Sequence, residues 1–197
     1  MFGVILASYA LHLVSYWTYS YVWSVATAKT YDISKAKDAV AVVVKNQLTI
    51  MPACGYLWLD FYGDDFYPYP DFGVEEVRQW GFMILLHEII FYHIHGLLHL
   101  PYFYKFHKLH HSWINPIPHI TLYASYFENA VLNFLPVIIS PIIMGLNPYY
   151  LPLWTVIATL SGVISHSLTY EHDIHHQKFV YNYGVIGICD YLYDTNM

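Results

Sequence analysis

The stretches that decide the fold are residues 95–111, HGLLHLPYFYKFHKLHH, and residues 166–176, HSLTYEHDIHH. Within them, histidines recur at steps of three or four positions, which on a helix place imidazoles on one face within reach of a shared ion. Unrelated core or interfacial histidines are the alternative, but two HxxHH clusters and an HxxxH pair in one chain favour a metal site. The clustered residues are His95, His99, His107, His110, His111, His172, His175 and His176, with His166 just before the last cluster.

The number of histidines favours two metal ions over one. A structural zinc ion is satisfied by about four ligands, so nine histidines exceed the need of a single ion. Imidazole suits iron, zinc, copper and nickel alike, and the residues leave the identity of the metal open. Cys54 and Cys189 are the only cysteines and form no CxxC pair, which argues against iron–sulfur clusters and thiolate zinc sites.

The composition predicts a membrane protein. Hydrophobic residues make up 57% of the 197 residues, aromatic residues 19% and charged residues only 11%. A spanning helix needs ~20 residues, so the shortest apolar run, with Pro136 and Pro141 inside it, is expected to be re-entrant or tilted. We therefore predict an all-α fold, a multi-pass integral membrane helical bundle. The apolar runs are residues 2–26, 39–59, 79–100, 131–146 and 149–165.

The order of the apolar runs predicts where the histidines meet. If residues 131–165 enter the membrane and return, the clusters before and after them lie on the same side. Residues 60–76 carry acidic but no basic side chains, whereas lysines follow the first run and flank the second cluster. The positive-inside rule then places the histidines in the cytoplasm. The lysines concerned are Lys29, Lys35, Lys37, Lys105 and Lys108.

The chain is expected to form a single membrane domain over residues 1–197. Residues 1–76 supply the N-terminal membrane runs and a loop, and residues 77–197 the histidine-rich region. The net charge of −6 argues against a nucleic-acid partner, which requires a basic surface. A metal-binding or metal-transport protein is an alternative to an enzyme. Transporters, however, hold ionisable sites near the middle of the membrane, whereas these clusters follow the apolar runs.

Residues 88–195 resemble a known family. The segments EIIFYHIHGLLHLPYFYKFHKLHHSWINP and EHDIHHQKFVYNYGVIGICDYLYDT are similar to the fatty acid hydroxylase and sterol desaturase superfamily of membrane di-iron oxidases. Within that superfamily, the C4-methylsterol oxidase and cholesterol 25-hydroxylase branch is the most similar. The first two membrane runs resemble it less, apart from KNQLTIMP at residues 45–52.

This resemblance implies a lipid oxidoreductase of the endoplasmic reticulum with a site that faces the cytoplasm. Two iron ions, which zinc can replace on purification, would activate O2 to hydroxylate or desaturate a sterol or acyl chain. Electrons would come from cytochrome b5 and an NAD(P)H-dependent reductase. Asp173 and Asp190 would be structural or accept ring N–H groups of ligands, with a solvated charge or a helix cap as the alternative. The implied iron ligands are His95, His99, His107, His110, His111, His166, His172, His175 and His176.

The chain departs from the family pattern at several positions, which keeps a catalytically inactive relative open. Gly96 stands where the family usually has Arg, and Ser125 where many members have His. The connection SLTYE, residues 167–171, is shorter than in relatives and includes Glu171, a further candidate ligand or a solvated charge. A six-residue step turns His166 away from His172 on a helix, so the helix must bend or fray between them. We expect interfacial or packing roles for His87, His93 and His119, and pocket-lining or interfacial roles for the aromatic residues of 101–126 and 177–193.

Overall fold

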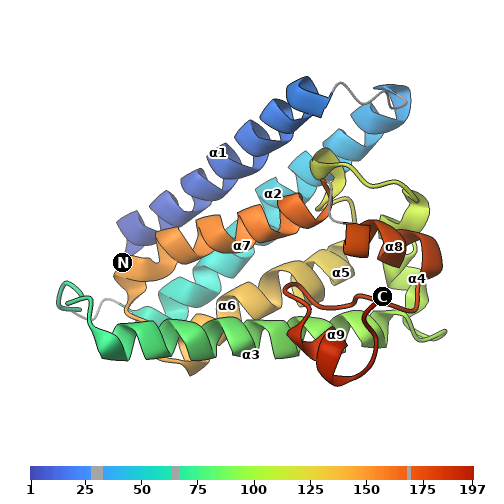
Figure 1. Ribbon diagram of the computed structural model, residues 1–197. Helices are drawn as coiled ribbons and strands as arrows, with labels where there is room; N and C mark the ends of the chain where they lie inside the picture. Colours follow the sequence, from blue (N-terminus) through green and yellow to red (C-terminus); the bar gives the residue numbers. More distant parts are fainter. Residues whose placement is uncertain (28–32, 64–66, 168–169) are drawn as a thin grey trace.

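The computed structural model describes residues 1–27, 33–63, 67–167 and 170–197. In these ranges the chain forms helices and turns without a strand, which confirms the all-α prediction (Figure 1). The α-helices are α1 (Phe2–Thr27), α2 (Ile33–Tyr62), α3 (Val74–Leu98), α4 (Tyr104–His107), α5 (Tyr126–Glu128), α6 (Leu135–Ile143), α7 (Leu151–Ser165), α8 (Tyr170–Lys178) and α9 (Ile188–Leu192). Shorter 3-10 turns are η1 (His110–Ser112), η2 (Pro118–Ile120) and η4 (Pro148–Tyr150), and η3 (Asn129–Phe134) is a π-helix.

The most extensive helix contact joins α1 and α7, which lie side by side and run in the same direction (Figure 1). The residues that α1 buries recur every three or four positions and so form one stripe along the helix. Much of its remaining surface is apolar and exposed, as at Leu6, Val14 and Val22. A polar inner stripe with an apolar outer surface suits a helix that packs against protein on one side and lipid on the other. The stripe consists of Ile5, Ser8, His12, Tyr16, Ser20 and Trp23.

The second apolar run forms one continuous helix, α2, with Pro52 inside it. The buried side chain of Asn46 explains why a polar residue interrupts this run. Its Nδ2 donates to the carbonyl oxygens of Leu122 and Ala124, at 3.1 and 3.0 Å. Asn46 thereby ties α2 to the segment that follows η2.

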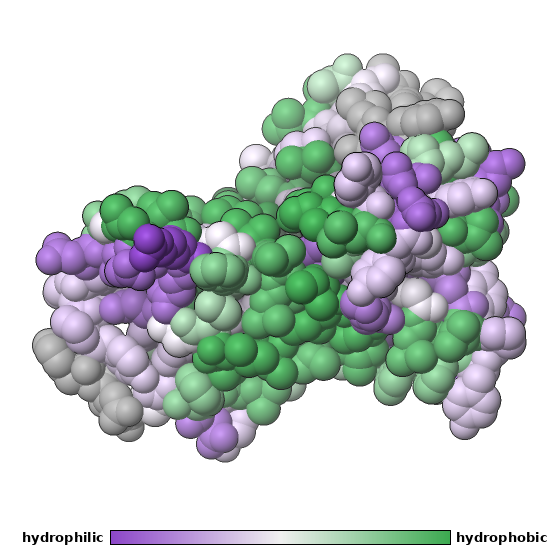
Figure 2. Space-filling view, turned by 60° about the horizontal axis from the view of Figure 1, so that its bottom comes forward, coloured by the Kyte–Doolittle hydropathy of each residue, from purple (hydrophilic) through white to green (hydrophobic). Residues whose placement is uncertain are grey.

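Among the residues that the structure describes, three helical segments are long and apolar enough to cross a membrane, which confirms the multi-pass prediction. They are Lys35–Tyr62, Val74–Leu98 and Tyr126–Ile143. The last segment joins α5, η3 and α6, so the run with Pro136 and Pro141 is continued by a π-helix on its N-terminal side. In the view of Figure 2, apolar side chains gather in the middle of the surface and hydrophilic ones toward both ends.

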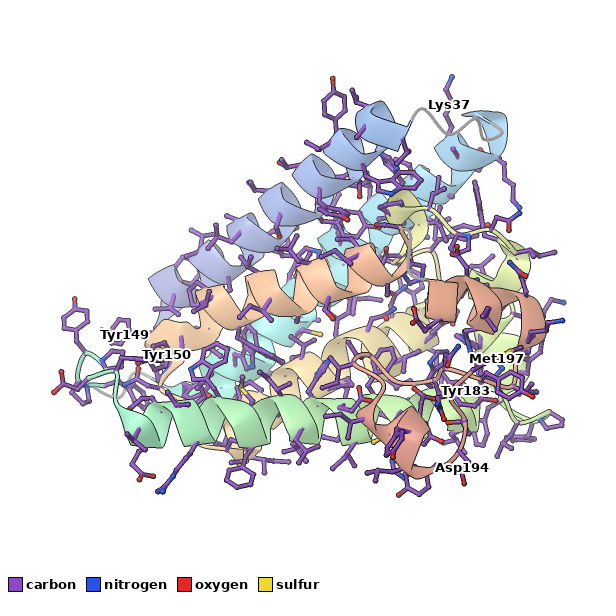
Figure 3. The ribbon with its side chains drawn as sticks, viewed as in Figure 1. Lys37, Tyr149, Tyr150, Tyr183, Asp194 and Met197 are labelled. Carbon is purple, nitrogen blue, oxygen red and sulfur yellow. The ribbon has the colours of Figure 1, made fainter. Side chains whose placement is uncertain are left out.

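The two ends of the bundle carry different residues. In Figure 3, Tyr149 and Tyr150 mark one end, and Tyr183 and Met197 lie at the other, where the histidine clusters converge. The lysine-bearing start of α2 shares the histidine end, because Lys35 Nζ donates to the carbonyl oxygen of Ser112 at 3.0 Å. Lys29 and residues 64–66 of the acidic loop lie outside the described residues.

Candidate metal centre

The first two clusters come from helix ends and the short turns between them. His95 lies in the last turn of α3, and His99 is the C-cap of this helix one turn further on. After a reversal of the chain, His107 ends α4, while His110 and His111 lie in η1. The predicted i, i+4 spacing therefore holds for the first pair, and the second cluster is assembled from two short helical turns.

The third cluster lies on α8, and His166 reaches it from a separate helix. Helix α7 ends at Ser165 with His166 as its C-cap, and α8 begins at Tyr170. The helix is thus interrupted between His166 and His172, as the six-residue step required. Residues 168–169 of the short SLTYE connection lie outside the described residues, so its proposed role as a roof over the pocket stays a prediction.

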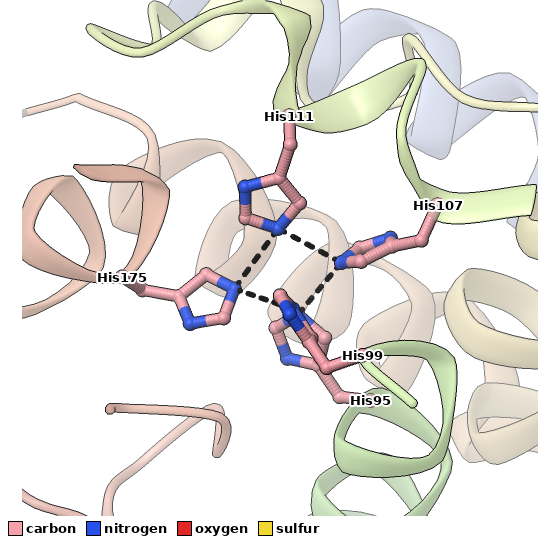
Figure 4. A group of neighbouring side chains, drawn as sticks. All are labelled: His95, His99, His107, His111 and His175. Atoms are coloured by element: carbon pink, nitrogen blue, oxygen red, sulfur yellow. Dashed lines mark hydrogen bonds between the residues drawn. The ribbon is translucent and has the colours of Figure 1, made fainter. Parts of the chain in front are cut away.

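All nine histidines come together in two adjoining groups. In each group, one ring nitrogen per histidine lies within 4.8 Å of the corresponding nitrogens of the others. We name them the five-histidine group, drawn in Figure 4, and the four-histidine group. The five-histidine group consists of His95, His99, His107, His111 and His175, and the four-histidine group of His110, His166, His172 and His176.

The facing Nε2 atoms have the separations expected of ligands around a common ion. Ligands at right angles and about 2.1 Å from one ion are about 3.0 Å apart. In the five-histidine group the Nε2–Nε2 distances are 3.2 Å for His95–His107, 3.0 Å for His107–His111, 3.2 Å for His111–His175 and 3.2 Å for His99–His175. In the four-histidine group they are 3.2 Å for His110–His166, His166–His172 and His172–His176.

The opposite nitrogens, Nδ1, show why these contacts fit a cation. His95 Nδ1 lies 2.7 Å from the carbonyl oxygen of Tyr183, to which it donates. His107 Nδ1 lies 2.8 Å from Glu128 Oε1, a carboxylate oxygen that accepts its proton. A neutral imidazole has one N–H group, so the facing Nε2 atoms of His95 and His107 both carry lone pairs. Two lone pairs at this distance repel each other unless a cation lies between them, and the donor set therefore fits a metal ion.

Three further rings have their Nδ1 atoms held in the same way. His166 Nδ1 lies 2.8 Å from the Gly162 carbonyl oxygen, His175 Nδ1 2.7 Å from that of Tyr181, and His176 Nδ1 2.8 Å from that of Trp113. Donation from Nδ1 fixes the tautomer and the orientation of each ring and makes Nε2 the better ligand.

Burial keeps the imidazoles neutral. It lowers the pKa of His99 to about 4, and burial together with the nearby His166 lowers the pKa of His176 to about 3. Burial and the neighbouring rings also hold the pKa values of His107, His111 and His172 well below the ordinary value. The rings are therefore unprotonated at neutral pH, the state in which a histidine binds a metal.

Glu128 is a supporting residue to which the sequence pattern gave no role. Its side chain is 1% exposed and accepts the His107 N–H. Ser125, the departure from the family pattern, caps the turn that carries Glu128, since Ser125 Oγ accepts from the Glu128 backbone N–H at 3.1 Å. The local signal that could have indicated this role was the cap spacing, with Ser three residues before Glu.

A second support is a loop, residues 183–190, held between two buried carboxylates. Asp190 accepts the backbone N–H groups of Tyr183 and Gly184, at 2.8 and 2.7 Å. Glu88, on α3, accepts those of Val185 and Ile186, at 2.7 and 3.0 Å. A Cβ at Gly184 would collide with both carboxylates, so only glycine fits there. The clasped loop, as we call it, presents the Tyr183 carbonyl to His95.

The remaining sequence departures leave the two groups intact. A Cβ at Gly96 would meet no atom within 4 Å, so this glycine is not required by close packing. Glu171 is exposed and belongs to neither group. Asp190 acts on His95 only through the backbone of Tyr183, and Asp173, half-buried on α8, keeps its role as a prediction.

The other histidines lie outside both groups. His93 is exposed, and its Nδ1 lies 2.8 Å from the Ile89 carbonyl oxygen. His87 packs edge-on against Trp154, with ring centroids 5.2 Å apart, and His119 is half-buried. His12, buried on α1, also belongs to neither group, and its polar contacts were not foreseen from the sequence.

A cavity of about 410 Å³ runs through the bundle to the histidines. This volume is in the range of small-molecule sites. Helices α1, α2, α3, α6 and α7 supply most of the wall, and the lining includes no aromatic residue of 101–126 or 177–193. Of the two roles expected for the aromatic residues of those segments, lining of this cavity is therefore not observed, because helices from both halves of the chain enclose it. Four histidines line the cavity at one end, His95, His110, His166 and His172.

These features define a helical membrane protein whose buried histidine clusters form a candidate metal centre. The model of the fatty acid hydroxylase family matches residues 80–195, and the chain belongs to this family. The predicted family resemblance is thereby confirmed.

Comparison with known proteins gives the following similarities. The chain is 43% identical over 121 residues to the human fatty acid hydroxylase domain-containing protein 2, an alignment that covers 57% of this chain and 36% of that protein. It is 30% identical over 133 residues to the fatty acid hydroxylase ahd1 of Mycosarcoma maydis, covering 63% of this chain and 35% of that protein. It is 26% identical to the methylsterol monooxygenase erg25B of Aspergillus fumigatus, covering 95% of this chain and 76% of that protein. The chain thus spans about a third of the length of the first two of these relatives. No solved structure matches it significantly.

Proposed function

We propose that the chain is a membrane-bound non-haem di-iron oxidoreductase that uses O2 to hydroxylate or desaturate a sterol-like or fatty lipid. The observation that carries this proposal is the meeting of two neutral histidine groups with one end of a cavity inside an apolar bundle. The names of the relatives, which include a methylsterol monooxygenase and a Delta(7)-sterol 5(6)-desaturase, support a lipid as the substrate.

Each histidine group would hold one iron ion. The five-histidine group and the four-histidine group both offer enough nitrogen ligands for one ion each, and zinc would compete for the same nitrogens on purification. When bound, the two irons would supply the O2 activation and the oxidising power for attack on a C–H bond.

The chain itself positions the lipid and keeps water away. The cavity ends at His95 and His110, one from each group, so a lipid carbon placed there lies beside both groups. Glu128 and the clasped loop hold ring protons on Nδ1 and so keep the Nε2 atoms directed at the metals.

The proposed electron source is cytochrome b5 with an NAD(P)H-dependent reductase.

The proposed location is the endoplasmic reticulum, with the histidines facing the cytoplasm. The hydrogen bond of Lys35 to the Ser112 carbonyl, directly after the second cluster, supports this orientation, since lysines favour the cytoplasmic side. Cysteine tags beside Lys108 and after Asp194 should react with an impermeant reagent from the cytoplasmic side of sealed membranes, and a tag near Asp65 should not. Labelling of Lys108 and Asp194 tags from opposite sides would contradict a single site.

The activity is tested by supplying ¹⁸O2 to membranes that contain the protein and measuring oxidised lipids by mass spectrometry. Desaturation is scored in the same samples as lipids two mass units lighter. We expect oxygen-dependent products that are lost in the His110→Ala/His111→Ala variant. Bound metal without any oxidised lipid would instead favour the metal-binding or inactive alternatives.

A further inference from the structure

A directed series of hydrogen bonds crosses from α2 through α1 to α7 beside the cavity. Trp17 Nε1 donates to Gln47 Oε1 at 3.0 Å, which leaves the Gln47 amide nitrogen to donate to His12 Nε2 at 3.1 Å. His12 must then carry its proton on Nδ1, which donates to Thr159 Oγ1 at 2.8 Å. Thr159 in turn donates to the carbonyl oxygen of Thr155 at 2.7 Å. The single protons of Trp17 Nε1, His12 Nδ1 and Thr159 Oγ1 are therefore all committed.

Three hydroxyl groups on the α1 and α7 side of the cavity have their protons already used in hydrogen bonds. Ser8, Thr155 and Thr159 all line the cavity, and each donates its proton to the carbonyl oxygen four residues earlier in its own helix. A hydroxyl oxygen has two lone pairs as well as its proton, so only acceptor capacity remains on these three groups. We name Ser8, Thr155 and Thr159 the acceptor band.

The acceptor band lies at a defined distance from the histidine end of the cavity. Because α1 and α7 run in the same direction, Ser8 and Thr155 each lie one turn before the contacting pair His12 and Thr159 (Figure 1). Thr159 and Thr155 precede His166 by seven and eleven residues on α7, which corresponds to about 10 and about 16 Å along the axis.

We propose that the acceptor band binds the hydroxyl group of the lipid that occupies the cavity, about 10–16 Å from the carbon beside the histidines. This inference deepens the proposed function and rests on it, because it names the class of substrate as an elongated lipid with a remote hydroxyl. A hydroxyl can donate to the band, whereas a ketone oxygen cannot, since it has no proton to give. The apolar remainder of the lipid would fill the rest of the cavity.

Binding of matched lipids to the purified, detergent-solubilised full chain tests the proposal. Two sets of three probes are compared by displacement of radiolabelled cholestanol: cholestanol, cholestanone and cholestane, and octadecanol, octadecanone and octadecane. One neutral hydrogen bond corresponds to about fivefold in affinity. We expect the alcohol to bind about fivefold more tightly than the ketone and the hydrocarbon in at least one set.

Variants locate the preference on the protein. The double variant Ser8→Ala/Thr155→Val removes two of the three acceptors and leaves no neighbouring donor without a partner. Thr159 keeps one lone pair beside the His12 N–H that it accepts, so the alcohol-to-hydrocarbon ratio should fall below that of the unchanged protein. Ser15→Ala and Thr49→Val are matched controls, because the hydroxyls of half-buried Ser15 and exposed Thr49 also donate four residues back but do not line the cavity. Unchanged hydrocarbon binding in the double variant would show that the cavity is intact.

Three results would overturn the proposal: no alcohol preference or no binding in both sets, an alcohol preference as large in the double variant as in the unchanged protein, or a ketone that binds as tightly as the alcohol. These binding measurements need neither metal nor O2. A failure of the proposed oxidation would therefore be seen separately, as an absence of oxidised lipid with the alcohol preference intact.

Discussion

The two histidine groups differ in what holds them. In the five-histidine group, the ring protons of His95 and His175 go to carbonyls at residues 183 and 181, and that of His107 goes to Glu128. In the four-histidine group, the ring proton of His166 goes to Gly162, one turn back in its own helix, and that of His176 to Trp113. The five-histidine group thus depends on the C-terminal segment and a buried carboxylate. The four-histidine group depends on the end of α7 and on the segment that follows η1. The two proposed metal sites should therefore be separable by mutation.

The largest expected effect comes from removing one ligand of each group. The His110→Ala/His111→Ala variant should lower total transition metal from about two ions per chain and abolish lipid oxidation, because each proposed ion loses a nitrogen. Metal analysis of the detergent-purified protein is the measurement. The single variants sharpen the comparison, since His111→Ala should affect the five-histidine group and His110→Ala the four-histidine group. A double variant with full metal content and activity would show that the sites are assigned wrongly.

The next effect concerns the clasped loop. Gly184→Ala places a methyl group against Glu88 and Asp190 and should destabilise the protein by about 1–3 kcal/mol. Because this loop holds His95, metal should be lost from the five-histidine group first. Gly96→Ala is the control with the opposite sign, since its methyl group has open space and alanine favours the helix by up to about 1 kcal/mol. Equal denaturation midpoints for the two variants would show that Glu88 and Asp190 do not exclude a side chain at residue 184.

A smaller effect is expected at Glu128. Glu128→Gln keeps the size of the side chain but weakens its hold on the His107 N–H group, so metal affinity should fall by about 10–100-fold. Competition with a chelator of known affinity measures this change. Only one of the two ions should become easier to remove, and simultaneous weakening of both would show that the groups are not independent.

The smallest effect is the response of the metal-free protein to pH. The pKa of His99 is lowered to about 4 and that of His176 to about 3, so the unfolded state takes up protons near pH 6.5 before the folded state does. Stability should therefore fall as pH decreases from 7.5 to 6.0, by about 1 kcal/mol for each such histidine. His99→Ala and His176→Ala should each remove about this much of the pH dependence in unfolding titrations. If the two variants lost different amounts of pH dependence, burial would affect the histidines of the two groups to different extents.

Much of the candidate site could be predicted from local spacing. His95 and His99, one turn apart, end on one face of α3 because that spacing belongs to the helix itself. The convergence of the second and third clusters followed from the returning apolar pair, and Nε2 atoms of His110 and His166 are indeed 3.2 Å apart. Both arguments need only the periodicity of a helix and the thickness of a membrane.

The supports of the site could not be predicted in the same way. Glu88 meets the backbone N–H of Val185 across 97 positions of sequence, and His12 meets Thr159 across 147. Such pairs are chosen by tertiary packing, for which a single sequence gives no signal. The lining of the cavity could not be predicted for the same reason, because the residues that enclose it are mostly far from the histidine clusters in sequence.

The polar stripe of α1 also has a consequence for biogenesis. His12 leaves the ribosome 147 residues before its partner Thr159, and at about 5–20 residues per second this is a delay of about 7–30 s. Gln47 follows His12 by only 35 residues and is made within about 2–7 s. A buried polar group without a partner costs about 1–3 kcal/mol. Pairing of α1 with α2 through Gln47 would therefore give His12 a partner until α7 is synthesised, which makes Gln47 an intermediate partner during assembly as well as a member of the finished bundle.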